Sequence, residues 1–155
     1  MVSLIETLGE KLSARHQRLS VAESCTGGFL SNWITDSPGA SRYFEQGVVV
    51  YSNPSKQELL GVSAKSLEQF GAVSAEVATE MAQGLRLRAK TDYALAITGI
   101  AGPGGGMPDK PVGTVFIACA DGTACQTEEF HFPTDRIDFK RKAAEAAVRM
   151  LLKKL

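Results

Sequence analysis

One short segment limits the folds open to this chain: a strand that leads through a glycine turn directly into a helix. Leu19–Ala22 is typical of a buried strand, and the turn Glu23–Gly28 (Glu-Ser-Cys-Thr-Gly-Gly) follows it. The apolar residues of segment 29–34 have the spacing of one helix face. Glycines let a ligand approach the backbone, and the first amides of a helix are unpaired. The segment therefore predicts a reactive or anion-binding corner, or only a helix capped by Ser24 or Thr26.

Strand and helix patterns alternate along the rest of the chain. The β-branched run Gly47–Tyr51 predicts a strand, which we expect in the centre of a sheet. Tyr93–Ile97 predicts another strand. Val112–Cys119 and Ala124–Phe132, joined by the turn Asp121-Gly122, predict a hairpin. This order predicts a three-layer α/β/α sandwich with a mixed, mostly parallel sheet of about five strands.

Size and charge restrict the classes of protein. A length of 155 residues predicts one domain, residues 1–155. Seventeen basic and seventeen acidic side chains cancel, so we expect neither a nucleic-acid nor a membrane partner. No apolar run approaches the about 20 residues that span a bilayer, and Met1–Arg15 alternates charged with apolar residues, unlike a secretory signal. We therefore expect a cytoplasmic protein.

Few residues of the chain are suited to binding a metal. The three cysteines, Cys25, Cys119 and Cys125, are too few and too irregularly spaced for a disulfide framework or a metal knuckle. His16 and His131 are the two histidines. We therefore predict no metal site.

Three corners follow predicted strands: Ser24–Gly28, Tyr51–Lys56 and Thr98–Gly106. In sheets of this class, ligands bind at the carboxyl ends of strands, so we expect these corners to share a ligand site. Five of the fifteen glycines lie within Gly99–Gly106. This loop lacks the lysine–hydroxyl ending of a P-loop and the G-x-G-x-x-G pattern. It is either a cradle for a phosphate or sugar, or a flexible connector.

Ser24 is a candidate nucleophile, whose developing oxyanion the following backbone amides would hold. It needs a base, and neither His16 nor His131 has a triad-like setting. Lys56 is the better candidate, one turn into a helix that we expect Asn53 to cap. Lowering a lysine pKa from about 10.4 to about 8 requires about 3 kcal/mol of selective destabilisation of the cation. Burial beside hydroxyls and away from carboxylates supplies it, and a solvated surface lysine is the alternative.

Two further features have alternative interpretations. Cys25 competes with Ser24 as nucleophile, because a helix N-terminus lowers a thiol pKa, but adjacent residues of a turn point in different directions. We therefore favour a packed Cys25 thiol. Arg136, Lys140 and Arg141 crowd the start of the last predicted helix, where cations are unfavourable. A bound anion would compensate, and the alternative is that these side chains are simply solvated.

Taken together, these segments resemble the C-terminal domain of the CinA (competence/damage-inducible) family. The matching motifs occur in order over nearly the whole chain: Val21–Gly28, Phe44-x-x-Gly47, Val50-Tyr51-Ser52-Asn53-x-x-Lys56, Gly71–Ser74, Thr98–Pro103 with Gly105-Gly106, and Lys110–Val115. Each motif is weak alone, and the ordered set is specific. The resemblance implies the α/β/α fold and hydrolysis of the carboxamide of nicotinamide mononucleotide to nicotinate mononucleotide and ammonia, in pyridine-nucleotide salvage.

The resemblance also implies roles by position. Ser24 becomes the nucleophile and Lys56 the general base of a serine hydrolase that uses neither a metal nor a cofactor. Ser41, Tyr51 and Thr98 become site hydroxyls, and Ser41 is the alternative nucleophile. Lys140 stands where an arginine is more usual. The resemblance and the corner positions predict this set of substrate-binding residues: Thr26, Gly27, Gly28, Asn53, Gly99, Gly102, Arg136 and Lys140.

Two functions therefore remain open. One is an amidohydrolase whose partner is a small-molecule nucleotide. The other is a non-catalytic nucleotide- or phosphate-binding regulatory domain that uses the same corners. Larger members of the family carry an additional N-terminal domain, for which we expect no room in 155 residues. A homo-oligomer is suggested only by the resemblance.

Overall fold

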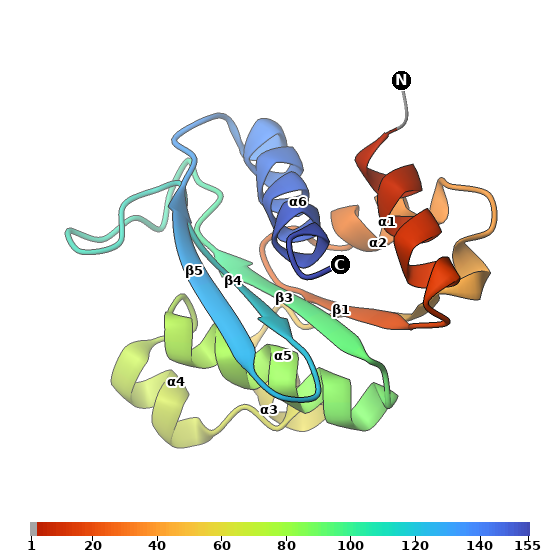
Figure 1. Ribbon diagram of the computed structural model, residues 1–155. Coiled ribbons are helices and arrows are strands. Elements are labelled where there is room, and N and C mark those ends of the chain that lie inside the picture. The colour runs from red at the N-terminus through yellow and green to blue at the C-terminus, as the bar shows by residue number, and fades with distance from the viewer. Residues whose placement is uncertain (1–2) are drawn as a thin grey trace.

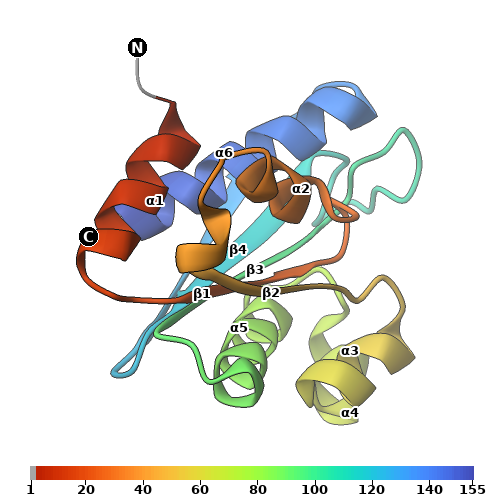
Figure 2. The ribbon, with the colours of Figure 1, turned by 90° about the vertical axis from the view of Figure 1, so that its right-hand side faces the viewer.

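A mixed five-stranded sheet lies between two layers of helices in the computed structural model, which describes residues 3–155 and so leaves Met1 and Val2 aside (Figures 1 and 2). The strand order is β2-β1-β3-β4-β5. β1 pairs in parallel with β2 and β3, whereas β3–β4 and β4–β5 are antiparallel. The predicted α/β/α class is confirmed.

The elements divide into the sheet and its two covering layers. The strands are β1 (Leu19–Glu23), β2 (Phe44–Val49), β3 (Tyr93–Gly99), β4 (Thr114–Ala120) and β5 (Cys125–His131). One face carries α1 (Leu4–Ala14), α2 (Phe29–Thr35) and α6 (Arg136–Leu152), with the 3-10 turn η1 (Ala40–Arg42) between α2 and β2. The other face carries α3 (Asn53–Leu60), α4 (Ala64–Phe70) and α5 (Ala75–Ala89) (Figure 2).

The alternation of side chains along the buried strands produces one core on each face of the sheet. Val21 of β1 belongs to the core under α1, α2 and α6, and its neighbour Ala22 belongs to the core over α5. α5 packs against this second core with one face, whose buried residues are Val77, Ala78, Met81, Ala82 and Leu85. The site at the end of β1 is thus fixed by packing from both sides.

β2 is an edge strand, so the expectation that the run Gly47–Tyr51 lies centrally is wrong. Val48 and Val50 pack into the core on the α5 side, whereas Val49 is 48% exposed. The strand itself ends at Val49, although the Val50 amide still donates to the Glu23 carbonyl at 2.8 Å. A β-branched run indicates a strand, but it does not reveal how many strands lie beside it.

The helix that carries Lys56 is capped one residue earlier than predicted. Ser52, not Asn53, is the N-cap of α3, and its hydroxyl accepts a hydrogen bond from the Ser55 amide at 3.2 Å. A cap at Asn53 would need the Lys56 amide, which instead donates to the Ser52 carbonyl at 3.1 Å. Asn53 and Pro54 are therefore the first two helical residues.

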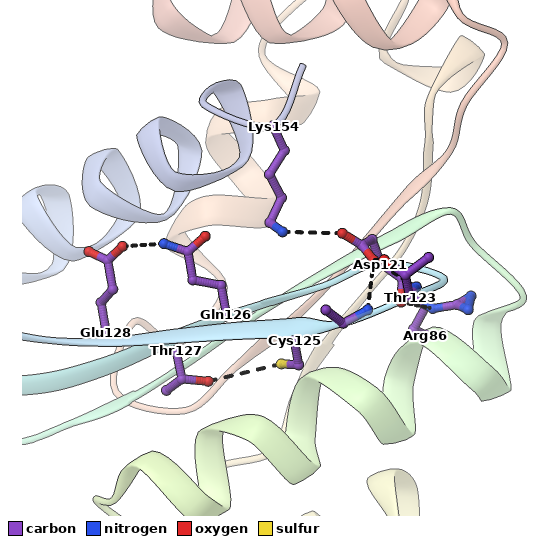
Figure 3. Close-up of polar contacts among 9 residues, drawn as sticks. Arg86, Asp121, Thr123, Cys125, Gln126, Thr127, Glu128 and Lys154 are labelled. Carbon is purple, nitrogen blue, oxygen red and sulfur yellow. Dashed lines mark hydrogen bonds and ion pairs between the residues drawn. The ribbon is translucent and has the colours of Figure 1, made fainter.

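The β4–β5 hairpin was predicted correctly, and Asp121 organises its turn (Figure 3). One carboxylate oxygen accepts the amides of Thr123 and Ala124 at 2.8 and 2.9 Å, and the other accepts the Lys154 ammonium at 3.1 Å. These hydrogen bonds hold the pKa of Asp121 well below its usual range. The ion pair joins the hairpin to the segment that follows α6.

All three cysteines are free thiols. Within residues 3–155, no three His, Cys, Asp or Glu side chains gather in a group that could hold a metal ion. In the same part of the chain, no helix combines the length and the apolar character needed to cross a membrane.

α3 and α5 meet at Gly84, where a Cβ would lie 1.8 Å from the carbonyl oxygen of Leu60. We predict that Gly84→Ala lowers the free energy of unfolding by about 2 kcal/mol, because the clash exceeds the gain in helix propensity. Gly104→Ala is the control, since nothing lies within 4 Å of its Cβ position. Urea unfolding measures both variants, and an unchanged midpoint for Gly84→Ala would contradict the close contact.

Candidate active site

A cleft of about 190 Å³ opens at the edge of the sheet where the parallel strands β1, β2 and β3 end. The three predicted corners meet there, together with the loop before α5 and the first residue of α6. The lining residues are Ser24, Cys25, Tyr51, Asn53, Lys56, Ala72, Val73, Thr98, Gly99, Ala101 and Arg136. The structure thus gathers most of the predicted site residues around one cavity.

Ser24 and Lys56 are in direct contact in this cleft. The Nζ atom of Lys56 lies 3.1 Å from the Oγ atom of Ser24 and 3.1 Å from the carbonyl oxygen of Tyr51. Ser24 follows the rigid central strand, and its amide donates to the Ile97 carbonyl of β3 at 3.0 Å. A hydroxyl and an amine at this distance can exchange a proton when the amine is neutral.

The surroundings of Lys56 disfavour its charged form. Its side chain is 1% exposed, so Lys56 is not a solvated surface lysine. Within residues 3–155, no Asp or Glu forms an ion pair with it. Burial lowers the pKa of Lys56 below the ordinary lysine value, against a smaller opposing effect of Cys25. The base predicted from sequence therefore has the environment that such a base requires.

The helix that follows the turn is capped from outside by a carboxylate. Gly28, the N-cap of α2, has a φ of 101° and no side chain to cap with. The Glu23 carboxylate instead accepts the amides of Leu30 and Ser31, both at 2.9 Å. These are the amides that a capping side chain normally satisfies. Among the described residues, the amides of Phe29, Leu30 and Ser31 in the first turn of α2 are therefore all paired and not free for a ligand.

The alternative prediction, that Ser24 or Thr26 caps α2, is wrong. The Ser24 hydroxyl points to Lys56, and the Thr26 hydroxyl is buried without a partner among residues 3–155. Gly27 and Gly28 both have positive φ, which makes the turn sharp. The Glu23 carboxylate therefore accepts the amides that a side chain at the N-cap position would otherwise accept.

The turn keeps some backbone donors unpaired, but not all of the predicted ones. The Gly27 amide donates to the Ser24 carbonyl at 3.1 Å, so it is not free for an anion. The amides of Cys25, Thr26 and Gly28 donate to no backbone carbonyl in the described part of the chain. Such unpaired amides at a turn are potential donors to a negatively charged oxygen.

The other two hydroxyls of the cleft have different surroundings. Thr98 is buried, and its hydroxyl donates to the Ala72 carbonyl at 2.8 Å. The Thr98 hydroxyl proton is therefore used in a hydrogen bond to the loop before α5. Tyr51 is 63% exposed, and its hydroxyl accepts from the Arg136 guanidinium at 3.2 Å. Arg136 also donates to the Gly102 carbonyl at 2.7 Å, which places Gly102 beside the cleft.

Lys140 lies beside the glycine turn. Its Nζ lies 3.6 Å from the position that a Cβ of Gly27 would occupy. No ion pair of Lys140 exists within residues 3–155, whereas Arg141 pairs with Asp138 at 2.6 Å and Glu145 at 2.8 Å. Of the three cations at the start of α6, Arg136 and Lys140 therefore face the site and Arg141 does not.

Ser41 does not belong to the cleft. It is exposed in η1, before the amino end of β2, whereas the cleft lies beyond the carboxyl end of that strand. Within one chain, this placement contradicts its predicted role as a site hydroxyl and as an alternative to Ser24. The order of the motifs places Ser41 before β2 in the sequence, but it does not indicate whether Ser41 lies at the amino or the carboxyl end of the strands.

Cys25 lines the cleft as a packed thiol. Its side chain is 6% exposed and belongs to the core under α6. Burial raises the pKa of Cys25 to about 12, so the thiolate is disfavoured. This agrees with the preference for Ser24 over Cys25 as a nucleophile.

Four contributors to the site were not predicted. Ala72, Val73 and Ala101 line the cleft through residue types that carry no chemical signal. Glu23 is the fourth: from sequence it either orients site groups or only ends the strand, and in the structure its carboxylate accepts the Leu30 amide.

The comparison with known proteins agrees with this architecture. The family model of the CinA C-terminal domain matches residues 1–155. A CinA-like protein of Syntrophomonas wolfei subsp. wolfei is 48% identical over 99% of this chain and 37% of its own length. A putative competence-damage inducible protein of Caldicellulosiruptor bescii is 46% identical over 93% of this chain and 35% of its own length.

Solved structures give the same result. A CinA superfamily protein of Escherichia coli has a TM-score of 0.95 and 37% identity, covering 99% of this chain and 90% of its own. The competence/damage inducible protein CihA of Agrobacterium tumefaciens has a TM-score of 0.91 and 35% identity, covering 97% of this chain and 95% of its own.

The fold and the ordered motifs define an α/β/α domain with a serine–lysine cleft at its sheet edge. The chain belongs to the CinA C-terminal domain family. It spans about a third of the length of the curated relatives named above.

We predict that Lys56→Met raises the midpoint of thermal unfolding at pH 7, because methionine removes a buried ammonium group. The folded-state pKa of Lys56 is lowered, so the unfolded chain binds more protons between that pKa and about 10.4. The wild type therefore gains stability as pH rises through this window, and the difference between the two proteins narrows.

Lys65→Met, at an exposed position of α4, is the matched control and should show no such pH-dependent difference. Calorimetry from pH 6 to pH 10 measures it. A stability difference between Lys56→Met and the wild type that does not change between pH 6 and pH 10 would contradict the lowered pKa.

Proposed function

We propose that this protein hydrolyses the carboxamide of nicotinamide mononucleotide to nicotinate mononucleotide and ammonia, with Ser24 as nucleophile and Lys56 as general base. The observation that carries the proposal is the 3.1 Å contact between a buried, carboxylate-free lysine and a serine at the end of a central strand. A serine amidohydrolase needs such a pair, because a serine hydroxyl is a weak nucleophile until a base removes its proton.

In the acylation step, neutral Lys56 takes the Ser24 proton while Oγ attacks the carboxamide carbon. The oxyanion of the tetrahedral intermediate is stabilised by turn amides, since those of Cys25, Thr26 and Gly28 donate to no backbone carbonyl in residues 3–155. Lys56 then returns the proton to the amide nitrogen, the C–N bond breaks, and ammonia leaves. The product of this step is a nicotinoyl ester on Ser24.

In the deacylation step, neutral Lys56 takes a proton from water, and the resulting hydroxide adds to the ester carbon. Collapse of the second tetrahedral intermediate breaks the bond to Oγ, and Lys56 protonates Ser24. The free acid is released, and the enzyme returns to its starting state. The Tyr51 carbonyl, 3.1 Å from Nζ, keeps the amine directed at Ser24 in both steps.

The size and charge of the cleft support a nucleotide that is only partly enclosed. A volume of about 190 Å³ is below the roughly 300–1,000 Å³ usual for a fully enclosed drug-sized ligand. It suits the pyridine ring with its carboxamide. Arg136 at the rim and Lys140 beside Gly27 supply positive charge outside the cavity, where a phosphate would lie.

We predict that Ser24→Ala lowers ammonia release from nicotinamide mononucleotide by at least about 100-fold, because it removes the nucleophile. Lys56→Met lowers kcat by about 100- to 10,000-fold, the usual contribution of a general base. A coupled ammonia assay measures both, with nicotinamide and NAD as comparison substrates.

The same variants separate the proposed enzyme from a phosphate-binding regulatory domain. Ligand-induced stabilisation without turnover in the wild type, and retained in Ser24→Ala, would favour the regulatory domain. Equal turnover in the wild type and Ser24→Ala would contradict the proposed mechanism.

We also predict that Lys140→Ala raises the KM for nicotinamide mononucleotide about tenfold, the effect of losing one hydrogen bond to a charged group. It should leave the kinetics of nicotinamide riboside, which lacks the phosphate, unchanged. Arg141→Ala is the control, since Arg141 pairs with Asp138 and Glu145 instead. An equal effect of Lys140→Ala on both substrates would place the phosphate elsewhere.

A further inference from the structure

Glu23 is a fully buried carboxylate next to the proposed nucleophile. Its side chain is 0% exposed, and no Lys or Arg of residues 3–155 forms an ion pair with it. Its oxygens accept the amides of Leu30 and Ser31 at 2.9 Å and the Ser31 hydroxyl at 2.7 Å. A buried charge persists only where such hydrogen bonds replace water.

These three hydrogen bonds bridge the whole Ser24–Gly28 turn. The acceptor precedes the turn, at the end of β1, and the donors follow it, in the first turn of α2. Gly27 and Gly28, with φ of 59° and 101°, give the turn a shape that its own residues do not enforce. The Glu23 side chain therefore fixes the distance between the two ends of the turn.

The strand end to which Glu23 belongs is itself rigid. Glu23 aligns with Val49 of β2 and with Ile97 of β3, and its carbonyl accepts the Val50 amide at 2.8 Å. The amide of the next residue, Ser24, donates to the Ile97 carbonyl at 3.0 Å. The three hydrogen bonds that the Glu23 carboxylate accepts from Leu30 and Ser31, called the clamp below, thus link α2 to β1. Ser24 lies between the two linked segments.

We propose that Glu23 is a positioning residue: its clamp holds Ser24 Oγ against Lys56 and holds the unpaired turn amides in place for the oxyanion. This inference rests on the proposed role of Ser24 as nucleophile. Glu23 does not touch the cleft, so it acts through the turn and not on the substrate. A misplacement of about 1 Å in such a turn reduces turnover about 100-fold.

The test replaces Glu23 by glutamine, which has nearly the same size. One of its two terminal groups is an NH₂ donor, so it can no longer accept one of the two backbone amides. Glu23→Gln should lower kcat about 100-fold and change KM by less than about threefold. Ser31→Ala removes one of the three hydrogen bonds and should have a smaller effect. Glu45→Gln, which alters an exposed carboxylate at the amino end of β2, should leave kcat unchanged. Far-UV circular dichroism verifies that each variant is folded.

A second readout does not depend on the identity of the substrate. A fluorophosphonate phosphonylates an activated serine with loss of fluoride, and mass spectrometry follows the modification of Ser24. Glu23→Gln should slow this reaction about 100-fold. Rates within twofold of the wild type, in a folded variant, overturn the positioning role.

The two readouts also separate this proposal from the proposed function. In one outcome, the wild type does not hydrolyse nicotinamide mononucleotide but is phosphonylated at Ser24, and Glu23→Gln is phosphonylated more slowly. This result contradicts the proposed substrate and supports the positioning role of Glu23. Turnover and phosphonylation that are both unchanged in Glu23→Gln support the function and overturn the clamp. A wild type that neither turns over nicotinamide mononucleotide nor is phosphonylated at Ser24 contradicts both proposals.

Discussion

The contact between Lys56 and Ser24 is the interaction on which the rest of the site depends. It places an almost fully buried amine in the wall of the cleft, where no carboxylate of residues 3–155 forms an ion pair with it. The fold accepts a destabilising group there, and the same desolvation prepares the amine to act as a base. Stability and proposed function are therefore opposed at one side chain, and the two cores on either side of the sheet must offset its cost.

The parallel part of the sheet explains why the contact forms at all. Ser24 lies in the turn between β1 and α2, and Lys56 lies 32 residues later in α3. They meet because β1 and β2 run in the same direction. Each side chain is then aimed locally: Ser52 caps the helix that carries Lys56, and Glu23 closes the turn that carries Ser24. Global topology brings the groups to one edge, and short-range hydrogen bonds set their geometry.

The sequence was sufficient for the fold class and for the three corners, because periodicity, glycines and strand ends are local signals. It was insufficient wherever the outcome depends on neighbours. The edge position of β2 and the remote placement of Ser41 follow from the strand order. The cap at Ser52 depends on the fact that the Ser52 hydroxyl, and not the neighbouring Asn53 side chain, reaches the Ser55 amide. The sequence did not decide whether Glu23 orients site groups or only ends the strand, because its hydrogen-bond partners are set by the fold.

The central claim is that Lys56 gives up its proton more readily than an ordinary lysine. The most direct measurement is the titration of its Cε and Nζ resonances by NMR, with Lys56→Met used for assignment. The account predicts a pKa below the ordinary lysine value, because desolvation is its largest cause. A pKa at or above that value would show that the amine stays charged beside Ser24, and it would contradict the account of the site.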